Sequence, residues 1–204
     1  MTADNRQVRF LIDGDLLVYA AASACHQDFE WSSDTWPSYV NLTEALEKFK
    51  TDFERLVESF TATIGKSKAP EVVFCMTGAN NFRKEVLPTY KSNRGRKPPG
   101  YSEFQKQVED WLASEGLSVY RREGLEADDC LGILGTHQTS KYRNVIWSRD
   151  KDLRMIPCEH FEAGKLLEAE EGWDTRHPYQ TLIGDTTDGY KGLPGCGPVK
   201  AKKI

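Results

Sequence analysis

The sequence predicts an α/β protein in which a central, mostly parallel sheet is flanked by helices. Short segments at residues 8–12, 71–76 and 144–147 are apolar on both faces and alternate with helical segments. This alternation is typical of parallel strands that helices cover on both sides. The 204 residues are enough for one large domain, or for a domain with an appendage.

Each element follows from a local pattern of apolar residues. The longest predicted helix starts at Thr43, where residues 43–46 are close to a capping box, and it ends at residues 65–70. Residues 25–41 contain Trp31 and Trp36 and have no clear period, so we expect a loop that could face a partner. Further elements are expected as a strand at 117–120, helices at 16–24, 102–115, 126–138 and 179–183, and a hairpin at 158–174.

Acidic residues follow the predicted strand ends and open two later turns. They are Asp13, Glu126, Asp128, Asp129, Asp150, Asp152, Asp185 and Asp188. Acids at a helix start such as residues 126–129 are ordinary caps when they occur alone. Because the carboxyl ends of parallel strands meet at one edge of a sheet, we expect most of these acids to converge there. Converging carboxylates repel one another unless a cation lies between them.

Such a cluster predicts a site for hard cations. Carboxylates without histidine or cysteine select Mg²⁺ or Mn²⁺, and eight of them are about enough for two ions. Two ions about 4 Å apart are a known solution for phosphodiester hydrolysis. The four histidines are not paired at metal spacing, and the five scattered cysteines indicate reduced thiols in a cytosol-like compartment.

Charge is segregated along the chain although the net charge is only −4. Residues 83–97 contain six basic residues and one acid, and residues 159–174 contain six acids and one lysine. A phosphate-binding surface beside an acidic metal site gives this mixture. No apolar run approaches the length of a membrane span, and the first residues lack a signal pattern, so no membrane partner is expected.

The C-terminal residues carry a glycine-rich pattern, Gly-Leu-Pro-Gly-Cys-Gly-Pro at 192–198. A turn between short helices accounts for the glycines. A helix–hairpin–helix element, whose exposed backbone meets a DNA phosphate, also accounts for Lys200, Lys202 and Lys203. We divide the chain into an α/β core at 1–178, with its basic stretch at about 80–100, and a C-terminal element at 179–204.

Five motifs, in order, resemble the 5′-nuclease superfamily of phage 5′–3′ exonucleases, polymerase I 5′-nuclease domains and flap endonucleases. They lie at residues 11–14, 82–94, 126–129, 148–152 and 184–197 and cover nearly the whole chain. The resemblance implies a helical arch over a mostly parallel sheet and a helix–hairpin–helix. It also implies metal-dependent hydrolysis of DNA, or of RNA paired to DNA, from a 5′ end or flap, inside a bacterial or phage-infected cell.

The resemblance also assigns roles to residues. Asp13, Glu126 and Asp128 match ligands of a first metal, Asp129 lies between the sites, and Asp150, Asp152 and Asp188 match the second group with Asp185 nearby. Lys91 and Arg94 match residues that contact the scissile phosphate, and Tyr90 could stack near the 5′ end. The DNA-binding residues would be Arg83, Lys84, Arg96, Lys97, Gly195, Gly197, Lys200 and Lys202, with K⁺ bound by hairpin carbonyls.

Two departures from the family pattern bear on function. Gly78 stands where many members carry a first-metal aspartate, so water fills that position or the first site is weakened. Asp15 could compensate for the missing aspartate, but it is expected rather to cap the first helix. Family members also usually continue past the position of Ile204. A non-catalytic DNA-binding relative is therefore a second hypothesis, predicting salt-sensitive binding without cleavage. A PIN-type ribonuclease is a third, disfavoured by the arch and the hairpin.

Overall fold

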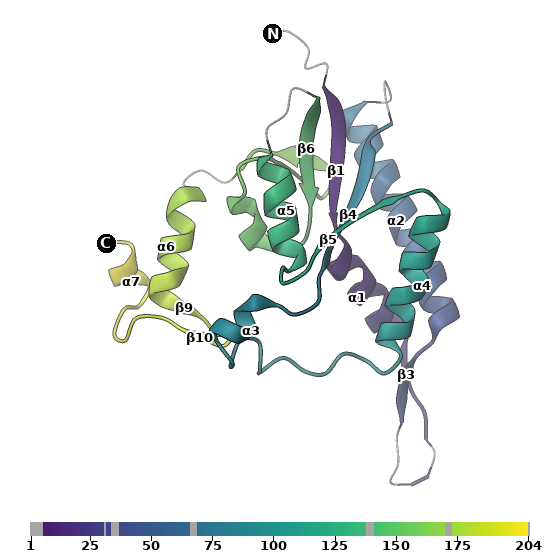
Figure 1. The fold of residues 1–204 in the computed structure, drawn as a ribbon, viewed down its shortest axis with the longest axis horizontal. Helices are drawn as coiled ribbons and strands as arrows, with labels where there is room; N and C mark the ends of the chain where they lie inside the picture. The colour runs from purple at the N-terminus through teal and green to yellow at the C-terminus, as the bar shows by residue number, and fades with distance from the viewer. Residues whose placement is uncertain are drawn as a thin grey trace.

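The computed structural model describes residues 6–30, 32–33, 37–65, 69–137, 141–169 and 173–203. Its centre is a six-stranded sheet in the order β5-β4-β1-β6-β7-β8 (Figure 1). The strands are β1 (Gln7–Asp13), β4 (Glu71–Thr77), β5 (Ser118–Arg122), β6 (Tyr142–Trp147), β7 (Glu159–Glu162) and β8 (Lys165–Leu167). All pairings are parallel except that of β7 with β8. The predicted fold class is confirmed.

The central strands are apolar on both faces because helices cover both sides. Phe10 and Ile12 of β1 pack into one core with α1 (Gly14–Ala24), α2 (Leu42–Ile64) and α4 (Tyr101–Ser114). Leu11 points the other way and packs with Leu131 of α5 (Ala127–Thr136) and with Leu153 of the 3-10 helix η1 (Lys151–Met155). Successive side chains of a strand point to opposite faces, so one apolar run supplies both cores.

The segment between α1 and α2 is not the simple loop that the sequence predicted. β2 (His26–Asp28) and β3 (Ser38–Val40) pair in antiparallel register and project from the body of the molecule (Figure 1). Three residues a strand are too few for a visible period, which is why the pattern was missed. Trp31 and Trp36 lie outside the described residues. Helix α2 begins at Leu42, one residue before the predicted start at Thr43. Its N-cap is Asn41, whose side chain accepts from Glu44 N at 3.3 Å.

The predicted arch is helical only over α3 (Phe82–Val86). Turns follow to about residue 94, and an irregular stretch leads to α4. Lys91 adopts a positive φ of 54°, and Pro88, Pro98 and Pro99 interrupt any longer helix. We keep the name arch for residues 82–97.

The C-terminal element consists of α6 (Trp173–Ile183), the short pair β9 (Gly184–Asp185) and β10 (Tyr190–Lys191), and α7 (Pro198–Ala201). Helix α6 begins before the predicted 179 and runs through the proposed boundary at 178/179, so the division into domains stays a prediction. The turn of residues 192–197 joins β10 to α7, as a helix–hairpin–helix requires. Within the described residues, no helix is both long enough and apolar enough to cross a membrane.

Candidate active site at the carboxyl edge of the sheet

The ends of β1 and β6 are tied together at the edge where acids were predicted to converge. Asp13 ends β1 and is 6% exposed. Its Oδ1 accepts from Leu16 N at 3.1 Å, which caps α1, and its Oδ2 accepts from Ser148 Oγ at 2.7 Å. Ser148 Oγ in turn accepts from Asp150 N at 3.1 Å. Neighbouring strands therefore bring Asp13 and Asp150 to one place.

Helix α5 adds three acids to this edge from its amino end. Glu126 is the N-cap and is 9% exposed, and its backbone N donates to Asp129 Oδ2 at 2.9 Å. Ala127 N donates to Thr77 Oγ1 at 3.1 Å, which fixes the helix start against the end of β4. Residues 126–129 therefore cap a helix and also line the site. The two interpretations of this motif are compatible.

The carboxylates of this edge are close enough to perturb one another. Burial, followed by the charges of Asp13, Asp150 and Glu126, raises the pKa of Asp128 to about 7, with Lys91 opposing the shift. Burial also raises the pKa of Asp13 to about 6, although hydrogen bonds from Ser148 and Leu16 oppose it. Crowded carboxylates with raised pKa values form a site that favours a bound cation.

The arch brings its own cations and a phenol to these acids. Lys91 Nζ lies 2.9 and 3.0 Å from the two oxygens of Glu126. Tyr90 OH donates to Glu126 Oε2 at 2.8 Å and lies 3.3 Å from Asp188 Oδ2, while Arg94 pairs with Asp188 at 2.8 Å. Burial and the Glu126 hydrogen bond raise the pKa of Tyr90, which keeps it a donor. The three predicted catalytic residues thus contact two of the predicted metal ligands, Glu126 and Asp188.

Arg83 pairs with Asp129 through two parallel hydrogen bonds of 2.6 and 2.7 Å. Burial alone would raise the pKa of Asp129, but the hydrogen bonds from Arg83 and Glu126 N outweigh it, and the pKa is lowered. Asp129 was predicted to lie between two metals, and Arg83 was predicted to contact DNA. In this structure the two side chains pair with each other, and both assignments stay predictions.

The remaining acids belong to local turns. Asp150 Oδ1 accepts from Asp152 N at 2.8 Å and so caps η1. Asp185 Oδ1 accepts from Thr187 N at 2.7 Å and Asp188 N at 3.3 Å. In the part of the chain that the structure describes, no three acidic, histidine or cysteine side chains are grouped as a metal centre. Ammonium, guanidinium and phenol groups pair with several of the acids in this structure. The candidate metal ligands are all carboxylate oxygens, the kind of ligand that Mg²⁺ and Mn²⁺ prefer.

Gly78 leaves no room for the aspartate that many family members carry. A Cβ there would lie 1.9 Å from the carbonyl oxygen of Arg122, because Gly78 N donates to Leu125 O at 2.8 Å and the two segments run side by side. The expectation that Asp15 caps α1 is wrong, because the cap is Asp13. Asp15 Oδ1 accepts from Thr77 N at 3.3 Å and joins α1 to β4.

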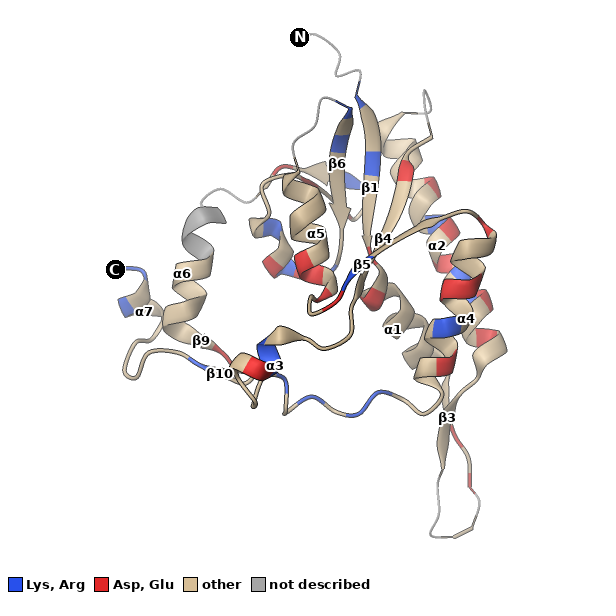
Figure 2. Ribbon diagram, viewed as in Figure 1, with Lys and Arg blue, Asp and Glu red and all other residues tan. Residues whose placement is uncertain are grey.

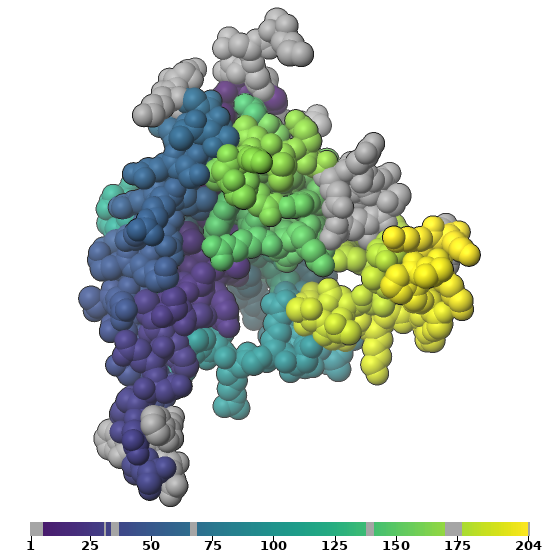
Figure 3. All heavy atoms as spheres, turned by 180° about the vertical axis from the view of Figure 1, so that it is seen from behind, coloured from purple at the N-terminus to yellow at the C-terminus, as the bar shows by residue number. Residues whose placement is uncertain are grey.

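The predicted DNA-binding residues divide between the arch and the C-terminal element (Figure 2). Lys84, Arg96 and Lys97 are exposed, and Lys97 Nζ lies 4.2 Å from the centre of the Tyr101 ring. Gly195, Gly197 and Lys202 are exposed, whereas Lys200 Nζ donates to Gly195 O at 2.9 Å and closes the hairpin turn. Viewed from behind, the arch crosses between the N-terminal helices and the C-terminal element (Figure 3).

Sequence reasoning missed three polar residues of this edge. Ser148 donates to Asp13, and Thr77 accepts from the backbone at the start of α5. Asn81 Nδ2 donates to Glu126 Oε1 at 2.7 Å. Ser148 was part of a recognised motif but carried no assigned role. Asn81 gave no signal beyond being a good N-cap residue.

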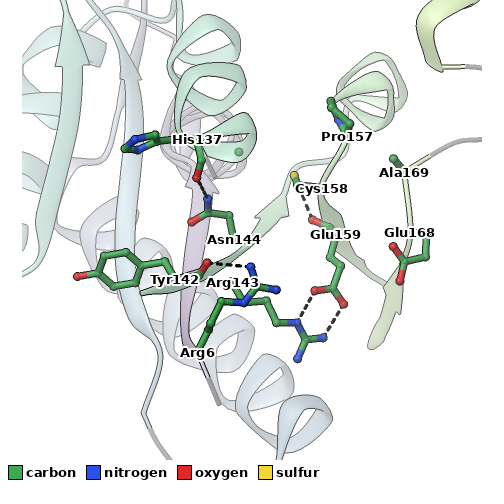
Figure 4. A pocket seen from close by; sticks show the side chains of 11 residues that line it. Arg6, His137, Tyr142, Arg143, Asn144, Pro157, Cys158, Glu159, Glu168 and Ala169 are labelled. Atoms are coloured by element: carbon green, nitrogen blue, oxygen red, sulfur yellow. Dashed lines mark hydrogen bonds and ion pairs between the residues drawn. The ribbon is translucent and has the colours of Figure 1, made fainter. Parts of the chain in front are cut away.

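A separate cavity of about 880 Å³ opens at the opposite end of β6 (Figure 4). The ion pair of Arg143 with Glu159 crosses it, and none of the predicted site residues lines it. The acid edge therefore remains the candidate site.

Comparisons with known proteins agree with the fold and identify the family. Residues 9–173 match the family model of the 5′-3′ exonuclease N-terminal resolvase-like domain. An exodeoxyribonuclease of Enterobacteria phage T3 is 34% identical over 196 residues, covering 92% of this chain and 63% of the phage protein. An exonuclease of Escherichia phage T7 is 33% identical, with the same coverage.

Among solved structures, the T5 D15 protein co-crystallised with metal ions superimposes with a TM-score of 0.68 at 16% identity, over 97% of this chain and 74% of that one. This likeness establishes the shared fold. The chain belongs to the 5′–3′ exonuclease family, which confirms the resemblance drawn from its motifs. It spans less than two thirds of the length of the T3 and T7 proteins that it matches.

Proposed function

We propose that this chain is a divalent-metal-dependent nuclease that hydrolyses phosphodiester bonds of DNA from a 5′ end or at a 5′ flap. The observation that carries the proposal is the meeting of Asp13, Glu126, Asp128 and Asp150, from three separate segments, beside Lys91 of the arch. The family match and the names of the T3 and T7 relatives support it. RNA paired to DNA is a further substrate class under the same proposal.

Under this proposal, two ions of Mg²⁺ or Mn²⁺ would bind the carboxylates of this edge, drawing them together and displacing the basic side chains that now pair with them. Asp13, Glu126 and Asp128 would hold the first ion, and Asp150, Asp152 and Asp188 the second, with Asp129 between them and Asp185 close by. When bound, the ions would supply an activated water and stabilise the leaving oxygen. The absence of a side chain at Gly78 would make the first site the weaker one.

When substrate binds, basic side chains of the arch would leave their acidic partners and pair with phosphate. Lys91 and Arg94 now neutralise Glu126 and Asp188. As DNA and metal bind, these two side chains would turn to the scissile phosphate, and Tyr90 would stack near the 5′ end. The remaining arch cations and the hairpin glycines, with K⁺ at their carbonyls, would hold the phosphate backbone of the duplex.

Cleavage of 5′-labelled DNA in Mg²⁺ or Mn²⁺ tests the proposal. Wild-type protein should release short 5′ products, and Asp128→Ala or Asp150→Ala should abolish the release without loss of fold. Asp110→Ala, on the exposed face of α4, is the matched control and should cleave normally. Full activity in both site variants would overturn the assignment. Comparing flap, nicked and blunt duplexes then separates exonuclease from flap endonuclease activity.

A second candidate is a DNA-binding relative that does not cleave. The blocked position at Gly78 and the ion pairs that occupy the acids favour it. It predicts salt-sensitive DNA binding with no product in Mg²⁺ or Mn²⁺. The same cleavage assay therefore distinguishes the two candidates.

A further inference from the structure

The connection between β4 and α3 is fixed against the segment that leads into α5. Gly78 N donates to Leu125 O at 2.8 Å, Gly124 N to Ala79 O at 2.7 Å, and Phe82 N to Gly124 O at 3.0 Å. These backbone bonds hold residues 78–82 beside residues 122–126. A side chain from this connection therefore reaches α5 from a position that does not depend on the rest of the arch.

Asn81 is the residue of this connection that contacts Glu126. Its Oδ1 accepts from Arg83 N at 2.9 Å and caps α3, and its Nδ2 donates to Glu126 Oε1 at 2.7 Å. The orientation of the amide is determined by its partners, since a backbone N–H can only donate and an ionised carboxylate can only accept. Exchanging the amide nitrogen and oxygen would break both hydrogen bonds.

Three side chains, those of Asn81, Tyr90 and Lys91, donate hydrogen bonds to Glu126, and they differ in how they affect its charge. Lys91 neutralises the charge of the carboxylate, and Tyr90 shares the same short stretch of the arch. Both would leave together if the arch turned toward a phosphate. Asn81 carries no charge and is held by backbone bonds outside that stretch. It can orient the carboxylate while leaving its negative charge available to a cation.

We propose that Asn81 is a positioning residue that holds Glu126 in the orientation needed to bind the first divalent metal ion. The inference rests on the proposed function. It also gives this chain a polar side chain after β4 at the acid edge, where Gly78 can carry none. Removing a residue that orients a metal ligand typically weakens metal affinity about 10–100-fold.

The test is Mn²⁺ binding by calorimetry to the full chain without DNA. Asn81→Ser keeps an N-cap oxygen for α3 but is too short to reach Glu126. The matched control is Asn80→Gly, which removes a similar amide–carboxylate bond, from Asn80 Nδ2 to Glu123 Oε1 at 3.0 Å, at a φ of 53° that glycine adopts freely. We expect Asn81→Ser to weaken Mn²⁺ binding about tenfold and Asn80→Gly to change it less than about twofold.

The Mn²⁺ dependence of cleavage is a second measurement, and a purely structural role of Asn81 would not change it. Asn81→Ser should need about tenfold more Mn²⁺ for half-maximal cleavage, should recover near wild-type rate at saturating Mn²⁺, and should keep its KM for DNA. If Asn81→Ser does not fold, Asn81→Thr provides the same cap and an equally short side chain. If the wild-type protein binds Mn²⁺ and Asn81→Ser binds it equally well, this inference is overturned and the proposed function is not. A wild-type protein that binds no Mn²⁺ overturns the proposed function and this inference with it.

Discussion

At the scale of single residues, Asp128 gives the metal-free protein a distinctive dependence on pH. Its pKa is raised to about 7 in the folded chain, and that of Asp13 to about 6, against 3.8 for an ordinary aspartate. The folded state therefore binds more protons than the unfolded state between about pH 4 and 7. Stability from these groups is complete below about pH 4 and is lost as pH rises through 6 to 7.

We expect wild-type protein in EDTA to lose more thermal stability between pH 5 and pH 8 than Asp128→Asn. The extra fall should be about 4–8 °C, on the scale of about 2 kcal/mol in a chain of this size. Melting curves at both pH values measure it. Because Mn²⁺ competes with protons for these carboxylates, added Mn²⁺ should raise the melting temperature more at pH 8 than at pH 5. Parallel losses in both proteins would contradict the assignment to Asp128.

Gly78→Asp should not restore the aspartate that the family pattern includes. Its Cβ would lie 1.9 Å from Arg122 O, which is backbone and cannot move aside without breaking the contacts of residues 78–82 with 122–126. We expect a loss of about 3 kcal/mol or more of unfolding free energy, measured by urea denaturation. Gly95→Asp adds the same carboxylate where nothing lies within 4 Å, and it should be nearly neutral. A Gly78→Asp protein as stable as Gly95→Asp would refute this geometry.

At the scale of elements, the arch and the acid edge compete for the same charges. The side chains of Lys91 and Glu126 are only 17% and 11% exposed, so their ion pair is poorly screened by solvent. A metal ion that uses Glu126 must displace this ammonium group. Under the proposed function, the arch would therefore lower metal affinity in the free protein, while it supplies the cation that the phosphate would later need.

Lys91→Ala should consequently bind Mn²⁺ more tightly than wild type, by about fivefold or more, while cleaving DNA more slowly. Of its cations, Glu126 then keeps only the more distant Arg83, whose Nη1 lies 3.9 Å from Glu126 Oε2 and which is already paired with Asp129, and metal binding relieves that cost. Calorimetry without DNA measures the affinity. Lys84→Ala, which removes an exposed lysine of the same arch, should bind Mn²⁺ as wild type does. Weaker binding by Lys91→Ala would show that the lysine supports the metal site rather than competing with it.

The elements that the sequence predicted well are those with an internal period. The apolar runs of β1, β4 and β6 and the helical stripe of α2 repeat over enough residues to identify them. The three-residue strands β2 and β3 do not, and the arch was expected to be helical on resemblance alone. The helix breakers at Pro88, Pro98 and Pro99 were visible in the sequence.

The candidate site was predictable where chemistry follows topology. Asp13 and Asp150 each follow a strand, so the sheet determines their meeting. The contacts of Ser148, Asn81 and Arg83 arise from segments more than 40 residues apart in sequence, and a single sequence carries no signal for them. The resemblance assigned Arg83 to DNA, and it could not show that Asp129 would engage Arg83 first.

At the scale of the whole molecule, a net charge of −4 must be reconciled with the proposed binding to a polyanion. Arg83, Lys91 and Arg94 of the arch are already paired with acids of the site, which leaves the exposed cations of the arch and the exposed lysines of the C-terminal element to attract the duplex. The exposed glycines at 195 and 197 let backbone approach a phosphate there, since nothing lies within 4 Å of either Cβ position. DNA affinity should therefore depend on a few exposed residues.

Replacing Lys202 and Lys203 together by alanine should weaken DNA binding and lower its salt dependence. Each phosphate contact that is lost should reduce the slope of log K against log salt by about 1. Fluorescence anisotropy with labelled duplex in EDTA measures binding without cleavage. Lys106→Ala, on the exposed face of α4, should keep the wild-type slope. If the double variant also keeps that slope, the C-terminal lysines do not contact phosphate, and the duplex must be held by Lys84, Arg96 and Lys97 of the arch.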